Sequence, residues 1–187
     1  MGEVLEPCAS CKASCCVNFR VCLTVFDIKR IANATSLSPL DFCELVREEE
    51  VKHYEKASIF LTGRNGKMGS YLPCLKRRRN GHCVFLEKNF SCSLYENRPR
   101  VCRCYPFRLD SSGKIAKVNN FRCPGDWKKE EIEREGYGEG IMNWDEECEK
   151  FAVICRRWNN TYGKTPGKGF LDFLEYAQSK SASTTGA

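Results

Sequence analysis

The sequence predicts an α+β protein: a small, irregular, helix-rich, metal-stabilised domain with short hairpins and a C-terminal helical segment. Fourteen of the 187 residues are cysteine, gathered near the N-terminus and again in the middle of the chain. Turn residues separate short apolar runs in the middle, and apolar residues recur at helical spacing in the last third. We expect a cysteine-cluster metal-binding domain over residues 1–125, a helical segment packed on it over 126–180 and a disordered tail over 181–187.

The first element is a cysteine motif, C-x2-C-x3-C-C, formed by Cys8, Cys11, Cys15 and Cys16. On a helix, the first three follow the spacing i, i+3, i+7 and point at one spot. Close thiolates repel one another unless a cation holds them, so the motif predicts a metal site. Cys16 lies about 100° around the helix from Cys15, and we expect it to serve a second ion or the core.

Two helices with N-terminal capping residues are expected next. Thr24-x-x-Asp27 begins a helix that runs to about residue 34. Ser38-Pro39-x-Asp41 begins a second, to about residue 57, with serine at the N-cap and proline at the first position. The inner face of the first helix is expected to consist of Val25, Ile28 and Ile31.

Alternating apolar and polar residues predict short strands. The turns Asn80-Gly81 and Ser112-Gly113 each sit between two such runs and favour hairpins. The predicted strands are residues 19–24, 71–76, 82–86, 107–110 and 114–118.

Four further helical stretches complete the expected fold. Ser93-x-x-Glu96 is a capping box that opens a short helical stretch. The C-terminal third is expected to form helices at about residues 126–136, 143–160 and 168–179.

Several cysteines are expected to be structural. Cys148 and Cys155 lie on an apolar stripe at helical spacing, and free cysteine packs as a small hydrophobe. Cys43 is assigned to the core for the same reason. Cys22 and Cys74 have no partner at ligand spacing and are left out of the metal site. The stripe consists of Trp144, Cys148, Phe151, Cys155 and Trp158.

A second set of candidate ligands lies in or next to loops. Cys92 precedes a helix N-terminus, where free N–H groups favour a thiolate. Cys102 adjoins Arg103, with Arg98 nearby, which also favours a thiolate. Cys104 is a second choice to Cys102. This downstream set consists of Cys83, Cys92, Cys102 and Cys123.

These residues carry a family resemblance. The opening motif and the downstream set together resemble the YkgJ-like cysteine-cluster family, whose CxxCxxCC domain is described as zinc- or iron-chelating. The resemblance covers roughly residues 8–125 and implies metal chelation. Because its relatives include flagellin lysine methylases reported as iron–sulfur proteins, it leaves a reaction open. The matching runs are Cys83-Val-Phe-Leu86, Cys92-Ser-Leu-Tyr95-Glu96-x-Arg98-Pro99-x-x-Cys102-Arg103-x-Tyr105-Pro106-Phe107 and Cys123-Pro124-Gly125.

The metal is expected to be iron in a sulfur cluster, most simply [4Fe–4S], with zinc as the alternative. Structural zinc usually takes two C-x2-C knuckles or a cysteine–histidine mixture, whereas this chain has one C-x2-C and only His53 and His82. An iron–sulfur cluster commonly takes a close run of cysteines and a distant one before proline, as at Cys123-Pro124. Eight candidate thiolates suffice for one or two centres.

The composition of the chain limits the cellular compartments and the binding partners that we expect for the protein. Residues 1–20 lack the apolar core of a signal peptide, and no stretch approaches the length of a membrane span. We therefore expect a cytoplasmic protein whose thiols stay reduced, without membrane contact. The net charge of +6 offsets anionic thiolate centres as readily as it binds nucleic acid. The basic run 76–79 is expected to be a solvated hairpin tip, with RNA binding as its alternative role.

Two classes of function stay open. One is a metal-cluster protein with a redox or cluster-dependent role and a redox partner, which includes a lysine-modifying enzyme related to the methylases. The other is a zinc-stabilised interaction module with a protein or RNA partner. The motif order C-x2-C-x3-C is the reverse of the C-x3-C-x2-C expected for radical S-adenosylmethionine enzymes, and no catalytic residue is indicated.

Overall fold

The computed structural model describes residues 11, 12, 14–51, 57–118, 123, 127, 132 and 137–181. These residues form helices and two small antiparallel sheets joined by loops, which confirms the α+β prediction. The helices are α2 (Ser14–Asn18), α3 (Val25–Thr35), α4 (Pro39–Phe42), η1 (Glu48–Glu50), η2 (Tyr95–Asn97), α5 (Arg100–Cys104), α7 (Tyr137–Thr161) and α8 (Phe170–Ser181). The strands are β1 (Cys43–Arg47), β2 (Ile59–Thr62), β3 (Met68–Leu75), β4 (Phe107–Leu109) and β5 (Ile115–Lys117).

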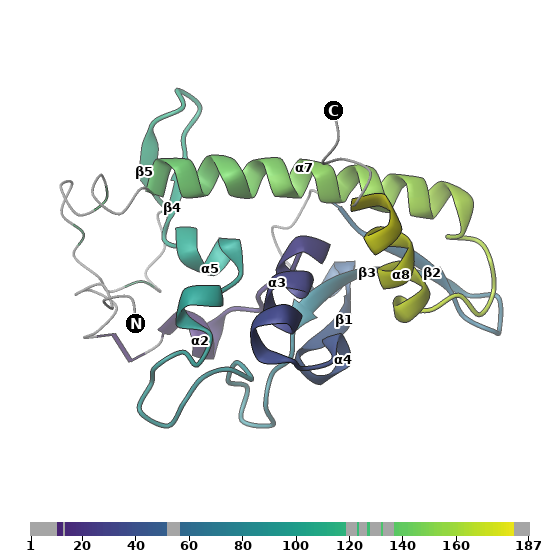
Figure 1. Cartoon of the computed structure of the whole chain (residues 1–187), viewed down its shortest axis with the longest axis horizontal. Coiled ribbons are helices and arrows are strands. Elements are labelled where there is room, and N and C mark those ends of the chain that lie inside the picture. Colours follow the sequence, from purple (N-terminus) through teal and green to yellow (C-terminus); the bar gives the residue numbers. More distant parts are fainter. Residues whose placement is uncertain are drawn as a thin grey trace.

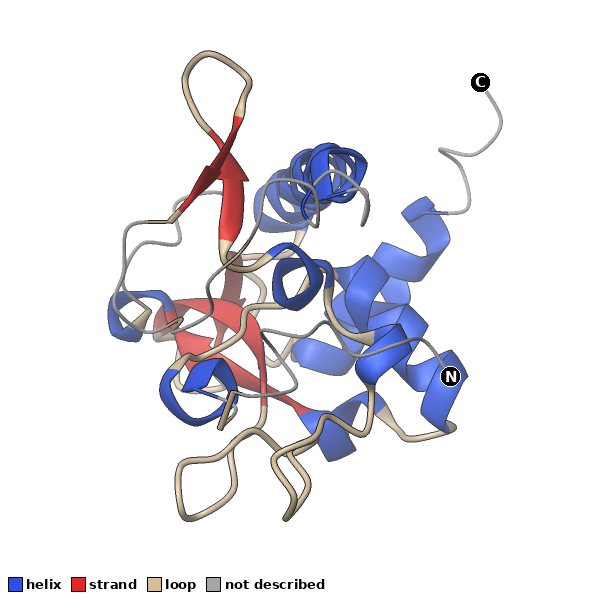
Figure 2. Ribbon diagram, turned by 90° about the vertical axis from the view of Figure 1, so that its left-hand side faces the viewer, coloured by secondary structure: helices blue, strands red, loops and turns tan. Residues whose placement is uncertain are grey.

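The larger sheet has three strands in the order β1-β3-β2, with β3 in the centre. Cys43 of β1 pairs with Leu75, and Thr62 of β2 pairs with Met68. The β2–β3 connection turns at Gly66, which has the positive φ of 76° that glycine adopts most readily. The β4–β5 hairpin stands apart from this sheet (Figures 1 and 2) and confirms the predicted hairpin around Ser112-Gly113.

The long helix α7 spans the molecule from the β4–β5 hairpin to α8 (Figure 1). It packs against α5 near its beginning and against β2 near its end. The indole N–H of Trp158 donates to the carbonyl of Phe60 at 3.0 Å, which fixes α7 to β2. The two C-terminal helices were predicted; α7 begins about two turns earlier than expected.

Two hydrophobic clusters share the long helix α7. The main core contains the predicted inner face of α3, together with Phe151, Cys155 and Trp158 of α7 and Phe173 of α8. The smaller cluster forms around Cys104, Phe107, Tyr137 and Ile141.

Local hydrogen bonds explain which helix starts were predictable. Thr24 and Asp27 form the expected capping box at α3, and Ser38 and Asp41 form the one at α4. The expected extension of the second helix to residue 57 is wrong, because α4 ends at Phe42 and the chain enters β1. Pairing along the whole of β1 with β3 outweighs the helical preference of this segment.

Other predicted elements differ in part. Residues 71–75 pair within the three-stranded sheet, and the predicted pairing around the Asn80-Gly81 turn is confined to a short stretch beyond β3. There the Val84 N–H donates to Lys76, the Arg78 N–H donates to His82, and a bridge joins Arg77 to Cys83. Of the predicted strand 19–24, Cys22 forms a bridge with Cys74. The predicted helix at 126–136 lies almost wholly outside the described residues. No helix in the described part of the chain is long and apolar enough to cross a membrane.

Candidate metal centre

Five cysteines from three segments gather in one group, which we call the thiol cluster. Cys15 and Cys16 lie on α2, Cys83 and Cys92 lie in the loop between β3 and η2, and Cys102 lies on α5. Burial raises the pKa of Cys102 well above its ordinary value, and the charges of Cys15, Cys83 and Cys92 raise it further. The structure therefore unites part of the opening motif with most of the downstream set, although about 70 residues separate them.

Cys15 and Cys16 act as a hydrogen-bonded pair. Their Sγ atoms lie 4.0 Å apart. The hydrogen bond from Cys16 lowers the pKa of Cys15 to about 6, against the effect of burial, and the positive charge of Arg98 assists. The same hydrogen bond, together with burial, raises the pKa of Cys16. Within the pair, Cys15 is thus the sulfur that more readily becomes a thiolate.

Arg98 supplies positive charge to the thiol cluster. Its Nε donates to the carbonyl of Tyr95 at 2.9 Å, and its guanidinium carbon lies 4.0 Å from the centre of the Tyr95 ring. Burial raises the pKa of Cys92, whereas the Leu94 N–H and Arg98 lower it. A backbone N–H at Cys92 and Arg98 at both cysteines therefore favour the thiolates of Cys92 and Cys102, as predicted, but burial outweighs them and raises both pKa values.

Backbone contacts hold α2 against the loop that carries Cys83. The N–H of Cys83 donates to the carbonyl of Cys16 at 2.9 Å. Arg77 donates to the carbonyl of Val17 at 2.6 Å and also to that of Phe19. Arg77 is thus a structural clamp across the end of α2, although the run 76–79 was predicted to be a solvated tip.

The same guanidinium closes the turn that leads into Cys83. Its Nε donates to the carbonyl of Gly81, in the turn predicted from Asn80-Gly81. One side chain therefore donates hydrogen bonds both to carbonyls at the end of α2 and to a carbonyl of the loop that carries Cys83.

The loop after β3 is fixed by burial as well as by hydrogen bonds. Phe85, Leu86 and Leu94 all enter the main core, and Leu86 forms a bridge with Cys92. The predicted capping box at Ser93 does not form: its hydroxyl donates to the carbonyl of Phe85, and η2 has no side-chain cap. The position of Cys92 is therefore set by core packing on both sides of it.

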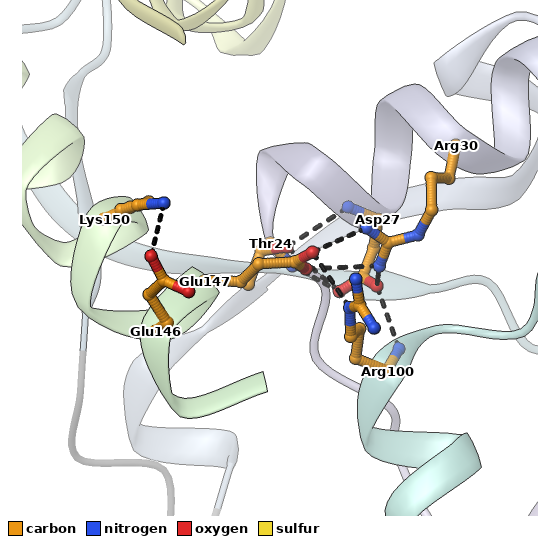
Figure 3. Close-up of polar contacts among 7 residues, drawn as sticks. All are labelled: Thr24, Asp27, Arg30, Arg100, Glu146, Glu147 and Lys150. Atoms are coloured by element: carbon orange, nitrogen blue, oxygen red, sulfur yellow. Dashed lines mark hydrogen bonds and ion pairs between the residues drawn. The ribbon is translucent and has the colours of Figure 1, made fainter. Parts of the chain in front are cut away.

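A buried carboxylate positions the helix that carries Cys102. Asp27 is 1% exposed, and its Oδ1 accepts the backbone N–H of Arg100, the first residue of α5, at 3.0 Å. Its Oδ2 accepts the backbone N–H of Thr24, at 3.0 Å, and the Thr24 hydroxyl. Burial raises the pKa of Asp27, while Arg30 and the N–H groups of Thr24 and Arg100 oppose that shift. The capping residue of α3 thus also caps α5 (Figure 3).

Glu147 of α7 completes this network. It accepts from Arg30 of α3 and from Arg100 of α5, each at 2.9 Å. Arg30 also pairs with Asp27 at 2.5 Å. Figure 3 shows these side chains converging from the three helices, with the Glu146–Lys150 pair lying apart from them along α7. The network therefore joins α3, α5 and α7 beside the thiol cluster.

The opening motif does not lie on one continuous helix. α2 begins at Ser14, so Cys11 lies in a bend before it, whereas Cys15 and Cys16 are helical. The i, i+3, i+7 geometry expected for these thiols is therefore wrong at Cys11. Cys8 lies outside the described residues.

Two downstream cysteines lie against the smaller hydrophobic cluster. Cys123, a predicted ligand, accepts a hydrogen bond from the indole N–H of Trp127 at 3.5 Å, and Trp127 packs against the smaller hydrophobic cluster. Cys104 is buried beside Phe107 and Ile141. It therefore packs within the smaller hydrophobic cluster, and its place as second choice to Cys102 stays a prediction.

The cysteines assigned to the core are buried as expected. Cys43, Cys148 and Cys155 are each no more than 2% exposed. Cys43 lies on β1 and not on a helix. Cys22 and Cys74, which were left without partners, lie with their Sγ atoms 3.6 Å apart. The alternation of apolar and polar residues over 19–24 was the sequence signal that could have indicated this contact between Cys22 and Cys74, since it placed Cys22 on a strand.

Comparison with known families matches residues 7–156 to CxxCxxCC, described as "Putative zinc- or iron-chelating domain". The chain belongs to the CxxCxxCC family. The matched range covers most of the chain and includes the whole thiol cluster together with Cys8, Cys11 and Cys123. The predicted resemblance is confirmed at this level. No curated protein and no solved structure matches the chain.

The donor set of this CxxCxxCC domain suits a thiophilic metal. Zinc and the irons of iron–sulfur clusters both accept sets of thiolates, and the side chains gathered here are thiols beside the guanidinium groups of Arg77 and Arg98. Among the described residues, no three His, Cys, Asp or Glu side chains already stand in a metal-binding arrangement. The thiol cluster thus has the right chemistry, and the side chains must draw closer to enclose an ion.

Proposed function

We propose that this CxxCxxCC protein binds an iron–sulfur centre through thiolates of the thiol cluster and uses it in a redox or cluster-dependent role. The supporting observation is that cysteines from three separate segments converge beside Arg98. Nothing in ordinary packing requires several partly buried thiols to meet. A shared metal ion or cluster accounts for their meeting.

Iron–sulfur is preferred to zinc on the kind of donors, because all the clustered ligands are soft thiols, and on the positive charge beside them. A four-thiolate zinc site and a [4Fe–4S] centre need the same number of ligands. The thiol cluster provides five thiols, and Cys8, Cys11 and Cys123 are further proposed ligands. A four-thiolate [4Fe–4S] centre is anionic, so the guanidinium of Arg98 would offset its charge and raise its potential. When bound, such a centre supplies one-electron transfer; the chain supplies the ligands, their burial and the positive charge.

Elemental analysis tests this proposal. Protein purified without oxygen should contain iron and acid-labile sulfide in a cluster-like ratio and should absorb near 400 nm. Cys102→Ser should lower iron and sulfide together. Cys155→Ser is the matched control, because that buried thiol lies in the main core and should leave both unchanged. Protein that contains zinc and no iron would refute the iron–sulfur assignment.

A zinc-stabilised interaction module is the second candidate. The loop between β3 and η2 contains isolated bridges and turns in place of regular strands. Metal binding would hold such a loop, and its free energy would then also be folding free energy. Zinc-loaded protein would be colourless and stable in air, which distinguishes it from the iron–sulfur form.

A further inference from the structure

Cys22 and Cys74 form a second pair of thiols, which we call the cross-strand dithiol. The two residues face one another in an antiparallel bridge, and their Sγ atoms lie 3.6 Å apart. A disulfide bond is about 2.05 Å long, so the two sulfurs need to approach by roughly 1.5 Å. Small rotations about the two Cα–Cβ bonds would bring the sulfurs this much closer.

The backbone holds this pair in the close type of cross-strand position. The hydrogen bonds lie on either side of the bridge and not within it: Leu23 N–H donates to Pro73 and Leu75 N–H donates to Val21, each at 2.8 Å. Residues at such non-hydrogen-bonded positions have Cα atoms about 4.5 Å apart. That separation falls within the range that disulfides span, about 4.4 to 6.8 Å.

The two thiols differ in their surroundings as an attacking and a resolving thiol would. Cys22 is partly exposed, whereas Cys74 is fully buried beside Val46 and Leu72. The hydrogen bond from Cys74 lowers the pKa of Cys22, and Arg20 lowers it further. The accessible sulfur is therefore also the better nucleophile.

A neighbouring thiol is the natural competitor. Cys43 adjoins this region on β1 and interacts with Cys74. Its Sγ contacts the carbonyl of Glu44 at 3.8 Å, and burial raises its pKa to about 12. Cys43 therefore stays protonated and buried, which leaves Cys22 as the partner of Cys74.

We propose that the cross-strand dithiol is a reversible redox site that closes to a Cys22–Cys74 disulfide, with a hydroperoxide as the oxidant. The Cys22 thiolate attacks the peroxide, so that an S–O bond forms, the O–O bond breaks and one water leaves after protonation. Cys74 then attacks the sulfenic sulfur, so that the S–S bond forms, the S–O bond breaks and a second water leaves. Two thiols lose two electrons to one hydrogen peroxide.

Closure would act on the segment that follows the thiol cluster. Residues 19–24 connect α2, which carries Cys15 and Cys16, to the start of α3. The disulfide would fix this connection to β3 covalently. The proposal does not depend on which metal the protein binds.

Peptide mapping tests the site directly on the full chain. Tryptic cleavage places Cys22 alone in residues 21–29, Cys74 alone in 68–76 and Cys43 alone in 31–47. The purified protein is treated with about one equivalent of hydrogen peroxide, its free thiols are alkylated, and it is digested without reductant. We expect a cross-linked 21–29/68–76 species, two hydrogen masses below the sum of its peptides, that dithiothreitol separates.

Other products would overturn the proposal. A cross-link between 31–47 and 68–76, or alkylated Cys22 and Cys74 in protein oxidised elsewhere, would show that this pair is not the redox site. In Cys74→Ser, dimedone should trap a sulfenic acid on Cys22, because no resolving thiol remains. Absence of that adduct in folded Cys74→Ser would refute the order of attack.

Discussion

The carboxylate of Asp27 accepts the backbone N–H of Arg100 at 3.0 Å, so one buried side chain caps both α3 and α5. Cys102, the cysteine of α5 that belongs to the thiol cluster, lies two residues beyond that contact. A residue in the first quarter of the chain thus fixes where a candidate ligand in the second half stands.

Replacing Asp27 by asparagine should destabilise the protein by about 2–4 kcal/mol, because Arg30 loses its buried partner and two helix starts lose a charged acceptor. Urea unfolding measures the change. Glu146→Gln is the control, since Glu146 and its partner Lys150 lie on the surface, where solvent screens the pair, and little change is expected. Equal losses in the two variants would contradict the role given to Asp27.

Glu147→Gln should weaken the contact between α7 and α5, because Glu147 pairs with both Arg30 and Arg100. We expect a loss of about 1–3 kcal/mol, since these arginines are only partly buried. In a double-mutant cycle with Asp27→Asn, the two losses should not add, because both residues act through Arg30 and Arg100. Strict additivity would mean that the network does not act as a unit.

Arg77→Ala should release α2 from the loop that carries Cys83. Three backbone carbonyls lose their donor, which we expect to cost about 1–3 kcal/mol. Amide hydrogen exchange should accelerate around Cys16 and Cys83, and metal content should fall with it. The neighbouring Arg79→Ala, at an exposed position, is the matched control; similar exchange in both variants would refute the clamp.

Removal of the metal should lower the thermal unfolding midpoint, because thiols from three segments would lose what holds them together. Calorimetry before and after treatment with a strong chelator measures the shift. Hydrogen exchange should increase mainly in residues 14–19 and 83–104 and little in α8. An increase confined to α8 would place the metal elsewhere.

The elements that the sequence predicted correctly depend on neighbouring residues. The capping box of Thr24 and Asp27 is a local pattern, and so is the apolar stripe of α7 that places Cys155 in the core. β1 was missed because its pairing with β3 joins segments about 30 residues apart, whereas Ser38 and Asp41 signalled a helix locally.

In the candidate site, too, local patterns were predicted and contacts between distant segments were missed. Loop position and nearby arginines selected Cys83, Cys92 and Cys102 from the sequence, and the structure gathers these thiols with Cys15 and Cys16. Spacing alone did not reveal that Arg77 clamps α2 or that Asp27 caps α5. These contacts join residues about 60 and 73 positions apart, and no short motif carries them.

The shared helix α7 decides whether the cysteine-rich part of the chain can fold without the C-terminal helices. Its first turns form a wall of the smaller hydrophobic cluster through Tyr137 and Ile141, and its later turns form a wall of the main core through Phe151 and Trp158. A fragment cut before α7 would leave both apolar surfaces open to water and would aggregate readily. The ligand-bearing segments therefore need the C-terminal helices in the same chain in order to fold.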